Sequence, residues 1–275
     1  WDNRTGIHLQ GGEGVGVVTR PGLGLEVGGP AINPVPRRMI TEAVTEAAGA
    51  LLAERGLVVE ISVPRGAELA KKTLNARLGI IGGLSILGTT GIVQPWSTAA
   101  WRASVEQAID VAAANGQRHV VLTTGGRSEK FAMKILPLPE IAFVEMGIFT
   151  GTALRRCVAR EIESVTLGGM VGKFAKLAQG HFQTHVAGNQ VDPIFLAELA
   201  ARAGAGPTVQ EAIRTANTAR HVQEIVLDAG VEGFFQVLTE EVAERSFAFV
   251  RGKLRVEAIL FDFDGRVLGW AERHG

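Results

Sequence analysis

Glycine-rich loops that follow apolar runs are the features of this sequence best suited to binding chemistry. Thr124-Gly125-Gly126 and Glu145-Met146-Gly147 each end a predicted strand and precede a predicted helix. Backbone N–H groups at helix starts can bind a carboxylate or phosphate, and a strand-end carboxylate can bind ribose hydroxyls. The loops therefore predict a site for a nucleotide-like ligand. We expect its contacts from Gly82, Gly83, Gly88, Thr89, Thr90, Gly91, Thr124, Gly125, Gly126, Glu145 and Gly147.

His181 and His185 are four residues apart and would share one face of a helix. Such a pair could ligate a metal ion, but the glutamate that zinc proteases carry between the two histidines is missing, so we predict no metal site. The pair could instead act as a base, donate to a carboxylate, or contact no ligand. Glu145 is the third candidate base, and the sequence does not rank the three.

Arg37 and Arg38 follow Pro36 at the predicted start of a helix. Cations at a helix N-terminus oppose the helix dipole, so they call for an explanation. A polyanionic ligand is one explanation, and a solvated helix end is the other.

Two phosphate-binding motifs are incomplete. Neither residues 11–16 nor residues 22–25 complete a G-x-G-x-x-G between a strand and a helix, which disfavours a nicotinamide dehydrogenase. Leu167 stands where a P-loop ahead of Gly172-Lys173 needs its first glycine. Kinase and NTPase functions are therefore not predicted.

Residues 259–266 resemble the nucleophile motif of haloacid-dehalogenase-like phosphatases. Arg266 replaces the threonine of that motif, however, and only residues 267–275 follow to supply the other catalytic parts. A hairpin turned at Asp264-Gly265 explains the segment better.

Cys157, in a predicted helix, is interpreted as a core residue.

The elements that must position these residues change character along the chain. From about residue 97 helices and strands alternate, which is typical of an open, mostly parallel α/β sheet with crossover helices. Helix starts are also predicted at Asp192-Pro193 and Thr208, and a helix over 231–249. The expected strands are 119–123, 141–146 and 164–167, and the expected hairpin is 254–268.

Residues 75–97 separate this region from a smaller α+β part, which holds a helix ended by Gly56 and a strand over 57–63. The apolar and glycine residues of 75–97 suit a strand buried on both faces that passes into a ligand-binding loop. We expect domains 1–74 and 75–275.

The uncharged window 78–101 is long enough to cross a membrane, but its glycines and Pro95 disfavour a spanning helix.

Composition excludes several classes of function. Lys+Arg and Asp+Glu both number 28, and the sequence pI is near 7.2, so the charge excess of a typical nucleic-acid-binding protein is missing. Tyr is absent, and aromatic residues make up 6% of the chain, which leaves few platforms for base stacking. A single cysteine excludes an internal disulfide and fits a reducing cytoplasm. We expect no nucleic-acid or membrane partner, and a homo-oligomer stays open.

Three blocks, residues 24–40, 75–97 and 168–178 with His181 and His185, resemble the cobalt-precorrin-5B C1-methyltransferase family of cobalamin biosynthesis. The blocks lie in the family's order, and the resemblance covers essentially the whole chain. Members normally carry a further N-terminal segment rich in Thr, Gly and Ala, whereas this chain opens at Trp1. We therefore expect a truncated chain or the latter part of a longer polypeptide.

The resemblance implies methyl transfer from S-adenosylmethionine to C1 of cobalt-precorrin-5B, giving cobalt-precorrin-6A. Cobalt would then belong to the substrate and not to a protein site. Because the tetrapyrrole carries many carboxylates, its pocket should be rimmed with cations. The cations we expect there are Arg37, Arg38, Arg127, Lys130, Lys173 and Lys176.

Two other classes stay open at this point. A nucleotide-dependent enzyme such as a reductase could use the same open sheet, although the dinucleotide fingerprint is missing. A tetrapyrrole carrier without methyl transfer would need the cationic rim but not the glycine loops, and it should not bind S-adenosylhomocysteine.

Overall fold

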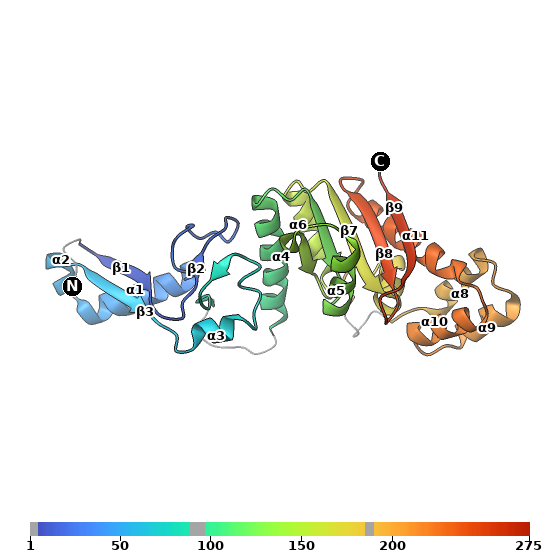
Figure 1. Ribbon diagram of the computed structural model, residues 1–275, viewed down its shortest axis with the longest axis horizontal. Helices are drawn as coiled ribbons and strands as arrows, with labels where there is room; N and C mark the ends of the chain where they lie inside the picture. Colours follow the sequence, from blue (N-terminus) through green and yellow to red (C-terminus); the bar gives the residue numbers. More distant parts are fainter. Residues whose placement is uncertain (1–4, 89–96, 185–189) are drawn as a thin grey trace. The chain divides into compact units, whose positions relative to one another are not determined.

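The computed structural model describes residues 5–88, 97–184 and 190–275. The chain divides into two compact units, Trp1–Thr98 and Ala99–Gly275, and the boundary expected near Leu74 lies inside the first of them. No helix among the described residues has the length and apolar character needed to cross a bilayer. Figure 1 shows the elements of both units.

The first unit contains two small sheets of two strands each. β1 runs parallel to β3, and β2 runs antiparallel to β4. Apolar side chains from the loops around β2 and β4, such as Val15 and Ile32, form its buried interior. The elements are β1 (Ile7–Gly11), β2 (Val17–Val18), α1 (Pro34–Ala48), α2 (Leu51–Glu54), β3 (Leu57–Ile61), α3 (Gly66–Ala70) and β4 (Ile80–Ile81).

The strand expected after residue 75 differs most from the prediction. β4 has two residues, pairs with Val17–Val18, and does not belong to the parallel sheet. Ile81 and Leu87 are exposed, so burial on both faces is wrong. Gly82 has a φ of +83°, and a Cβ on Gly83 would lie 2.3 Å from the Gly14 carbonyl oxygen. These glycines therefore serve a turn and a close backbone contact within the first unit.

The helix expected to reach Gly56 is also interrupted. α1 begins with Pro34 at its first position and ends before Gly49, whose φ is +50°. A separate turn of helix, α2, follows. The positive φ of Gly49, which glycine adopts at little cost, ends the first helix early.

The second unit is built on one sheet of five strands in the order β6-β5-β7-β8-β9. The first four run parallel, and β9 is antiparallel to β8, which confirms the predicted α/β architecture. Its elements are α4 (Thr98–Ala114), β5 (His119–Thr123), α5 (Gly126–Ile135), a 3-10 turn (Glu140–Ala142), β6 (Phe143–Glu145), α6 (Thr150–Ala159), β7 (Ser164–Met170), α7 (Val171–Ala178), α8 (Pro193–Arg202), α9 (Pro207–Arg214), α10 (Ala219–Asp228), α11 (Gly233–Phe249), β8 (Arg255–Phe261) and β9 (Val267–Arg273).

Helices cover the two faces of this sheet unequally. α5 packs on one face, where its Ala132 lies in a cluster with Val121 and Phe261. α4, α6, α7 and α11 pack on the other face, in a larger core that includes Leu122 and Leu167. Alternate residues of each strand thus point to different helix layers, as the pleat requires.

Cys157 lies in that larger core, as interpreted from the sequence. Burial raises the pKa of its thiol to about 12. The thiol is therefore not a nucleophile at neutral pH.

The predicted hairpin at the end of the chain is confirmed. β8 and β9 are antiparallel neighbours, and Gly265 in the turn has a φ of +94°. The Asp262 carboxylate accepts backbone N–H groups from Asp264 and Arg266, both at 2.8 Å. Residues 259–266, which resemble a phosphatase nucleophile motif, thus form the end of β8 and the turn that follows it.

An ion-pair cluster ties α4 to α6. Asp110, whose side chain is 15% exposed, accepts hydrogen bonds from the guanidinium groups of Arg156 and Arg160. Burial alone would raise the pKa of the Asp110 carboxyl, but the bonds from Arg160 and Arg156 outweigh burial and lower it. The carboxylate form is therefore favoured in the folded protein.

Replacing Asp110 by Asn is expected to lower the free energy of unfolding at pH 7 by about 1.5–3 kcal/mol. Because the folded pKa is lowered, this stabilisation is present above the unfolded value of about 3.9 and is lost as the pH falls through the folded value. Denaturant unfolding across this range measures the difference between the two proteins. A difference that stays constant down to about pH 2 would contradict the assigned role.

Candidate functional site

The order of the strands creates a crevice at one end of the sheet. From β5 the chain passes through α5 to β6, and from β6 it returns through α6 to β7 on the other side of β5. α5 and α6 lie on opposite faces, so the carboxyl ends of β5 and β7 are a topological switch point. Ligands bind at such points in open α/β sheets.

The loop after β5 leaves space at this switch point. The N–H of Thr124 donates to the Gly168 carbonyl at 2.9 Å, which links the ends of β5 and β7. A Cβ on Gly125 would meet no atom within 4 Å, and the φ of Gly125, 171°, suits any residue. The protein therefore does not itself require glycine at 125. A ligand that lies against this backbone would require glycine there.

The loop after β6 brings Glu145 next to the start of α5. A Cβ on Gly126 would lie 3.4 Å from Glu145 Oε2, so this carboxylate lies beside the first residue of the helix. Met146 and Gly147 both donate their N–H to the Thr123 carbonyl. The two predicted loops, Thr124-Gly125-Gly126 and Glu145-Met146-Gly147, are thus adjacent.

Gly147 has a clear structural role. Its φ is +58°, and a Cβ there would lie 2.1 Å from the Trp101 ring. Trp101 in turn makes an edge contact with Phe149, with ring centroids 5.2 Å apart. The fold requires glycine at 147 whether or not a ligand binds.

A cavity of about 660 Å³ opens beside the end of β7, against α7, α8 and α10. Lys173 and Lys176, predicted to share a helix face, both line it. The other lining residues are Met170, Val171, Gly172, Gln190, Val191, Pro193, Leu196, Ala216, Asn217, Thr218, Ala219, Arg220, Val222 and Phe263.

Both lysines reach toward the same carbonyl. Lys173 Nζ donates to Thr184 Oγ1 at 3.1 Å and to the Thr184 carbonyl at 3.3 Å, and Lys176 Nζ lies 3.5 Å from that carbonyl. Burial, followed by repulsion from Lys176, lowers the pKa of the half-buried Lys173. The pair is a concentrated positive charge that an anion in the cavity would neutralise.

The segment after α7 is fastened to the β6–α6 loop. The Phe182 carbonyl accepts the Gly151 N–H at 2.8 Å, and Thr184 donates its backbone N–H to the Ile148 carbonyl at 3.1 Å. His181, half-buried, donates its backbone N–H to the Lys176 carbonyl. Residues 181–184 therefore connect the helix that follows β7 to the loop and helix that follow β6. His185, the other predicted histidine, lies outside the described residues.

The remaining predicted residues are spread over both units. Arg37, in the first unit, donates to the Ile32 and Pro30 carbonyls, and Arg38 is exposed beside Glu42. Lys130 is exposed on α5. Gly82, Gly83 and Gly88 belong to the first unit, and Thr89, Thr90 and Gly91 lie outside the described residues.

Sequence reasoning missed Arg220 and Phe263, which also line the cavity. Arg220 lies on α10, a helix that was not predicted, and Phe263 lies at the hairpin tip that was interpreted only as a turn. An exposed aromatic residue inside an otherwise polar turn was the signal available. No pattern along the chain indicated that the two residues meet.

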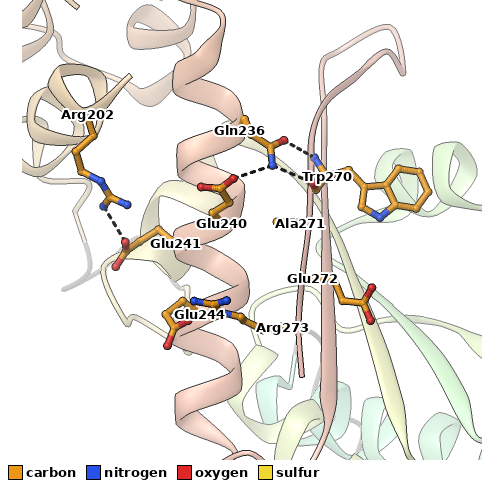
Figure 2. Close-up of a pocket in the computed structure, with 9 residues that line it drawn as sticks. All are labelled: Arg202, Gln236, Glu240, Glu241, Glu244, Trp270, Ala271, Glu272 and Arg273. Carbon is orange, nitrogen blue, oxygen red and sulfur yellow. Dashed lines mark hydrogen bonds and ion pairs between the residues drawn. The ribbon is translucent and has the colours of Figure 1, made fainter. Parts of the chain in front are cut away.

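A second cavity, of about 500 Å³, lies between α11 and β9 (Figure 2). Its charged groups largely pair with one another, as Arg202 does with Glu241 and Arg273 with Glu244. Arg273 pairs in register with Val256, near the amino end of β8, so this cavity is remote from the glycine loops. Within the described ranges no group of three or more metal-ligating side chains occurs.

Comparison with known proteins gave two family models, CbiD over residues 1–95 and the CbiD C-terminal domain over residues 183–272. A cobalt-precorrin-5B C(1)-methyltransferase of Geobacillus sp. (strain WCH70) is 53% identical over the whole chain and 75% of its own length. That of Thermus thermophilus is 52% identical, over 97% of this chain and 72% of its own.

A crystal structure of a cobalamin biosynthesis protein (cbiD) from Archaeoglobus fulgidus is 24% identical. It covers 82% of this chain and 59% of its own, with a TM-score of 0.27.

Proposed function

The chain belongs to the CbiD family of cobalt-precorrin-5B C(1)-methyltransferases, and we propose that it binds S-adenosylmethionine at the ends of β5 and β6 and the macrocycle in the neighbouring cavity. The family expected from residues 24–40, 75–97 and 168–178 is thereby confirmed. This placement of the cofactor is supported by the space beside Gly125, where an added Cβ would meet no protein atom within 4 Å.

The reaction asks the protein mainly for alignment. S-adenosylmethionine supplies a methyl group already activated as a sulfonium, and conjugation with ring nitrogens makes the macrocycle carbon nucleophilic. Holding two such partners in contact and free of water can lower the barrier by on the order of 7–11 kcal/mol. No nucleophilic side chain is required, in agreement with the buried Cys157.

The cofactor fits the chemistry of the two loops. The Glu145 carboxylate, beside Gly126, can accept hydrogen bonds from ribose hydroxyls. The first N–H groups of α5, a helix of ten residues, can bind the carboxylate of the methionine part. Gly125 lets the ligand approach the backbone between them.

The macrocycle fits the charge of the cavity. Lys173, Lys176 and Arg220 supply three cations, while Leu196, Val222 and other apolar residues line the rest. Peripheral carboxylates would bind the cations, and the ring would cover the apolar surface. Arg127 and Lys130 lie on α5, which starts next to Gly125.

The carbon–carbon bond forms as the carbon–sulfur bond of the sulfonium breaks, and a neutral macrocycle that gains the methyl group in this way returns to neutrality by losing a proton. Of the three candidate bases we propose His181, because Glu145 is used by the cofactor in this arrangement and His185 lies outside the described residues. His181 is half-buried on the segment that joins the ends of β6 and β7. The imidazole ring nitrogen that carries no hydrogen can accept the proton.

The test is calorimetric titration with S-adenosylhomocysteine, with NADH as the control, followed by a methyl-transfer assay. We expect binding of S-adenosylhomocysteine, no binding of NADH, and transfer of labelled methyl from S-adenosylmethionine to cobalt-precorrin-5B. Binding of NADH would favour a nucleotide-dependent reductase. Binding of the tetrapyrrole without S-adenosylhomocysteine would identify a carrier, and either result would contradict the proposal.

A further inference from the structure

Phe263 lies close to two arginines that come from different helices. The guanidinium carbon of Arg220, on α10, is 4.9 Å from the ring centroid, and that of Arg127, on α5, is 5.9 Å away. We propose that this Arg127–Phe263–Arg220 cluster binds peripheral carboxylates of the macrocycle at the rim of the cavity and sets the position of the ring. The inference rests on the proposed function and deepens it.

The tip of the hairpin holds Phe263 in a fixed place. Asp262 accepts two backbone N–H groups across the turn, and Arg266 donates to Glu232 at 3.0 Å. A Cβ on Gly265 would lie 2.6 Å from the Phe131 ring, so the turn sits directly against α5. Phe263 itself is 37% exposed and lines the cavity. The ring is thus an accessible element of the cavity wall, carried on a hydrogen-bonded turn.

The charges around the ring are available to an anion. Arg127 is exposed and makes no ion pair with any residue in the described ranges, and it lies in the first turn of α5, where a cation is unfavourable. Arg220 contacts Glu224 at 3.2 Å, but both side chains are more than half exposed, so that pair is weak. Asp262 is occupied by the turn, and Asp264 is exposed beside it.

A stacked guanidinium is suited to binding a carboxylate. Contact with the ring face restrains the plane of the group but leaves its N–H edge free, and that edge matches a carboxylate with two hydrogen bonds. One ring that restrains two such groups would hold two carboxylate sites at a fixed separation. Phe263 is then a positioning residue, and the arginines are the groups that touch the substrate.

The test compares Phe263→Leu with Phe263→Tyr in the methyl-transfer assay. Leu removes the aromatic face, and we expect KM for the macrocycle to rise roughly five- to tenfold with kcat nearly unchanged. Tyr keeps the face and should restore KM to within about twofold. Lys253→Gln, a charge change at an exposed residue just before β8 and outside the cavity lining, is the control and should leave KM unchanged.

Two further measurements separate this inference from the proposed function. Binding of S-adenosylhomocysteine and the midpoint of thermal unfolding should be the same in the Leu variant and the native protein. If KM stays unchanged in Phe263→Leu, or rises equally in Phe263→Tyr, the role of the cluster is overturned while methyl transfer stands. If the native protein transfers no methyl group but Phe263→Leu weakens binding of a polycarboxylate porphyrin, the function is wrong and the cluster is supported.

Discussion

Replacing Lys173 and Lys176 together by glutamine is expected to weaken macrocycle binding on the order of 100-fold, because each lysine loses a charge-assisted contact of about 1.5 kcal/mol. Both ammonium groups line the cavity and converge on the Thr184 carbonyl, so one anionic substituent can meet both. Binding of S-adenosylhomocysteine should change by less than about twofold, since no lysine lies in the two glycine loops.

The charge itself can be tested by varying salt and pH. Native binding should fall with ionic strength, because partly exposed charges are screened over about 8–10 Å, and the double variant should depend less on salt. Burial lowers the pKa of Lys173, so native affinity should decline as the pH rises toward that value, and this decline should be weaker in the variant.

Lys253→Gln is the matched control for these measurements. Lys253 is exposed just before β8, at the amino end of the parallel strands. We expect its replacement to leave macrocycle affinity unchanged. A double variant that instead loses S-adenosylhomocysteine and keeps the macrocycle would show that the two sites have been assigned the wrong way round.

Local sequence patterns were sufficient to predict most strands and several helices of the second unit. The buried runs 119–123 and 164–167 correspond to β5 and β7, and the helix start at Asp192-Pro193 is confirmed by a hydrogen bond from the Ile194 N–H to the Asp192 side chain. Each of these signals lies within a few residues of the element that it specifies. Parallel strands covered by helices are apolar throughout, so their burial is visible in the sequence.

The stretch 75–97 shows where local reasoning fails. Apolar residues interrupted by glycine fit a buried strand, but they also fit a chain that turns repeatedly against a neighbour. Gly83 packs against the backbone of Gly14, and Asn75 donates to the Gly83 carbonyl at 3.1 Å. Gly14 is distant from Gly83 in the sequence, so the periodicity of the stretch does not reveal that contact.

The candidate site also has one part that local sequence patterns predicted and one part that they did not. Its glycine loops follow strands and were predicted, whereas the cavity is assembled from α7, α8, α10 and the hairpin tip. Arg220 and Phe263 are more than forty residues from Lys173 in the chain. Only the tertiary arrangement brings their side chains to one wall, because helix and strand patterns specify which face is buried and not what it meets.

Replacing Gly125 by Val is expected to weaken S-adenosylhomocysteine binding about 10- to 100-fold, the penalty for forcing a side chain into space that the ligand needs. The backbone of Gly125 is extended, and a Cβ there meets no protein atom within 4 Å. Gly125 is the N-cap residue of α5, where valine is less favourable than glycine, so the free energy of unfolding should fall by no more than about 1 kcal/mol. Titration calorimetry and denaturant unfolding measure the two effects. Gly91, predicted for the same role, lies outside the described residues.

Gly147→Val is the matched control, because it introduces the same side chain in the adjacent loop. Its positive φ and the Trp101 ring 2.1 Å from the Cβ position should lower the free energy of unfolding by about 2–4 kcal/mol. The pair separates a glycine that serves a ligand from one that serves the fold. A folded Gly125→Val protein that binds S-adenosylhomocysteine as the native protein does would remove the β5–α5 loop from the cofactor site, whatever happens at Gly147.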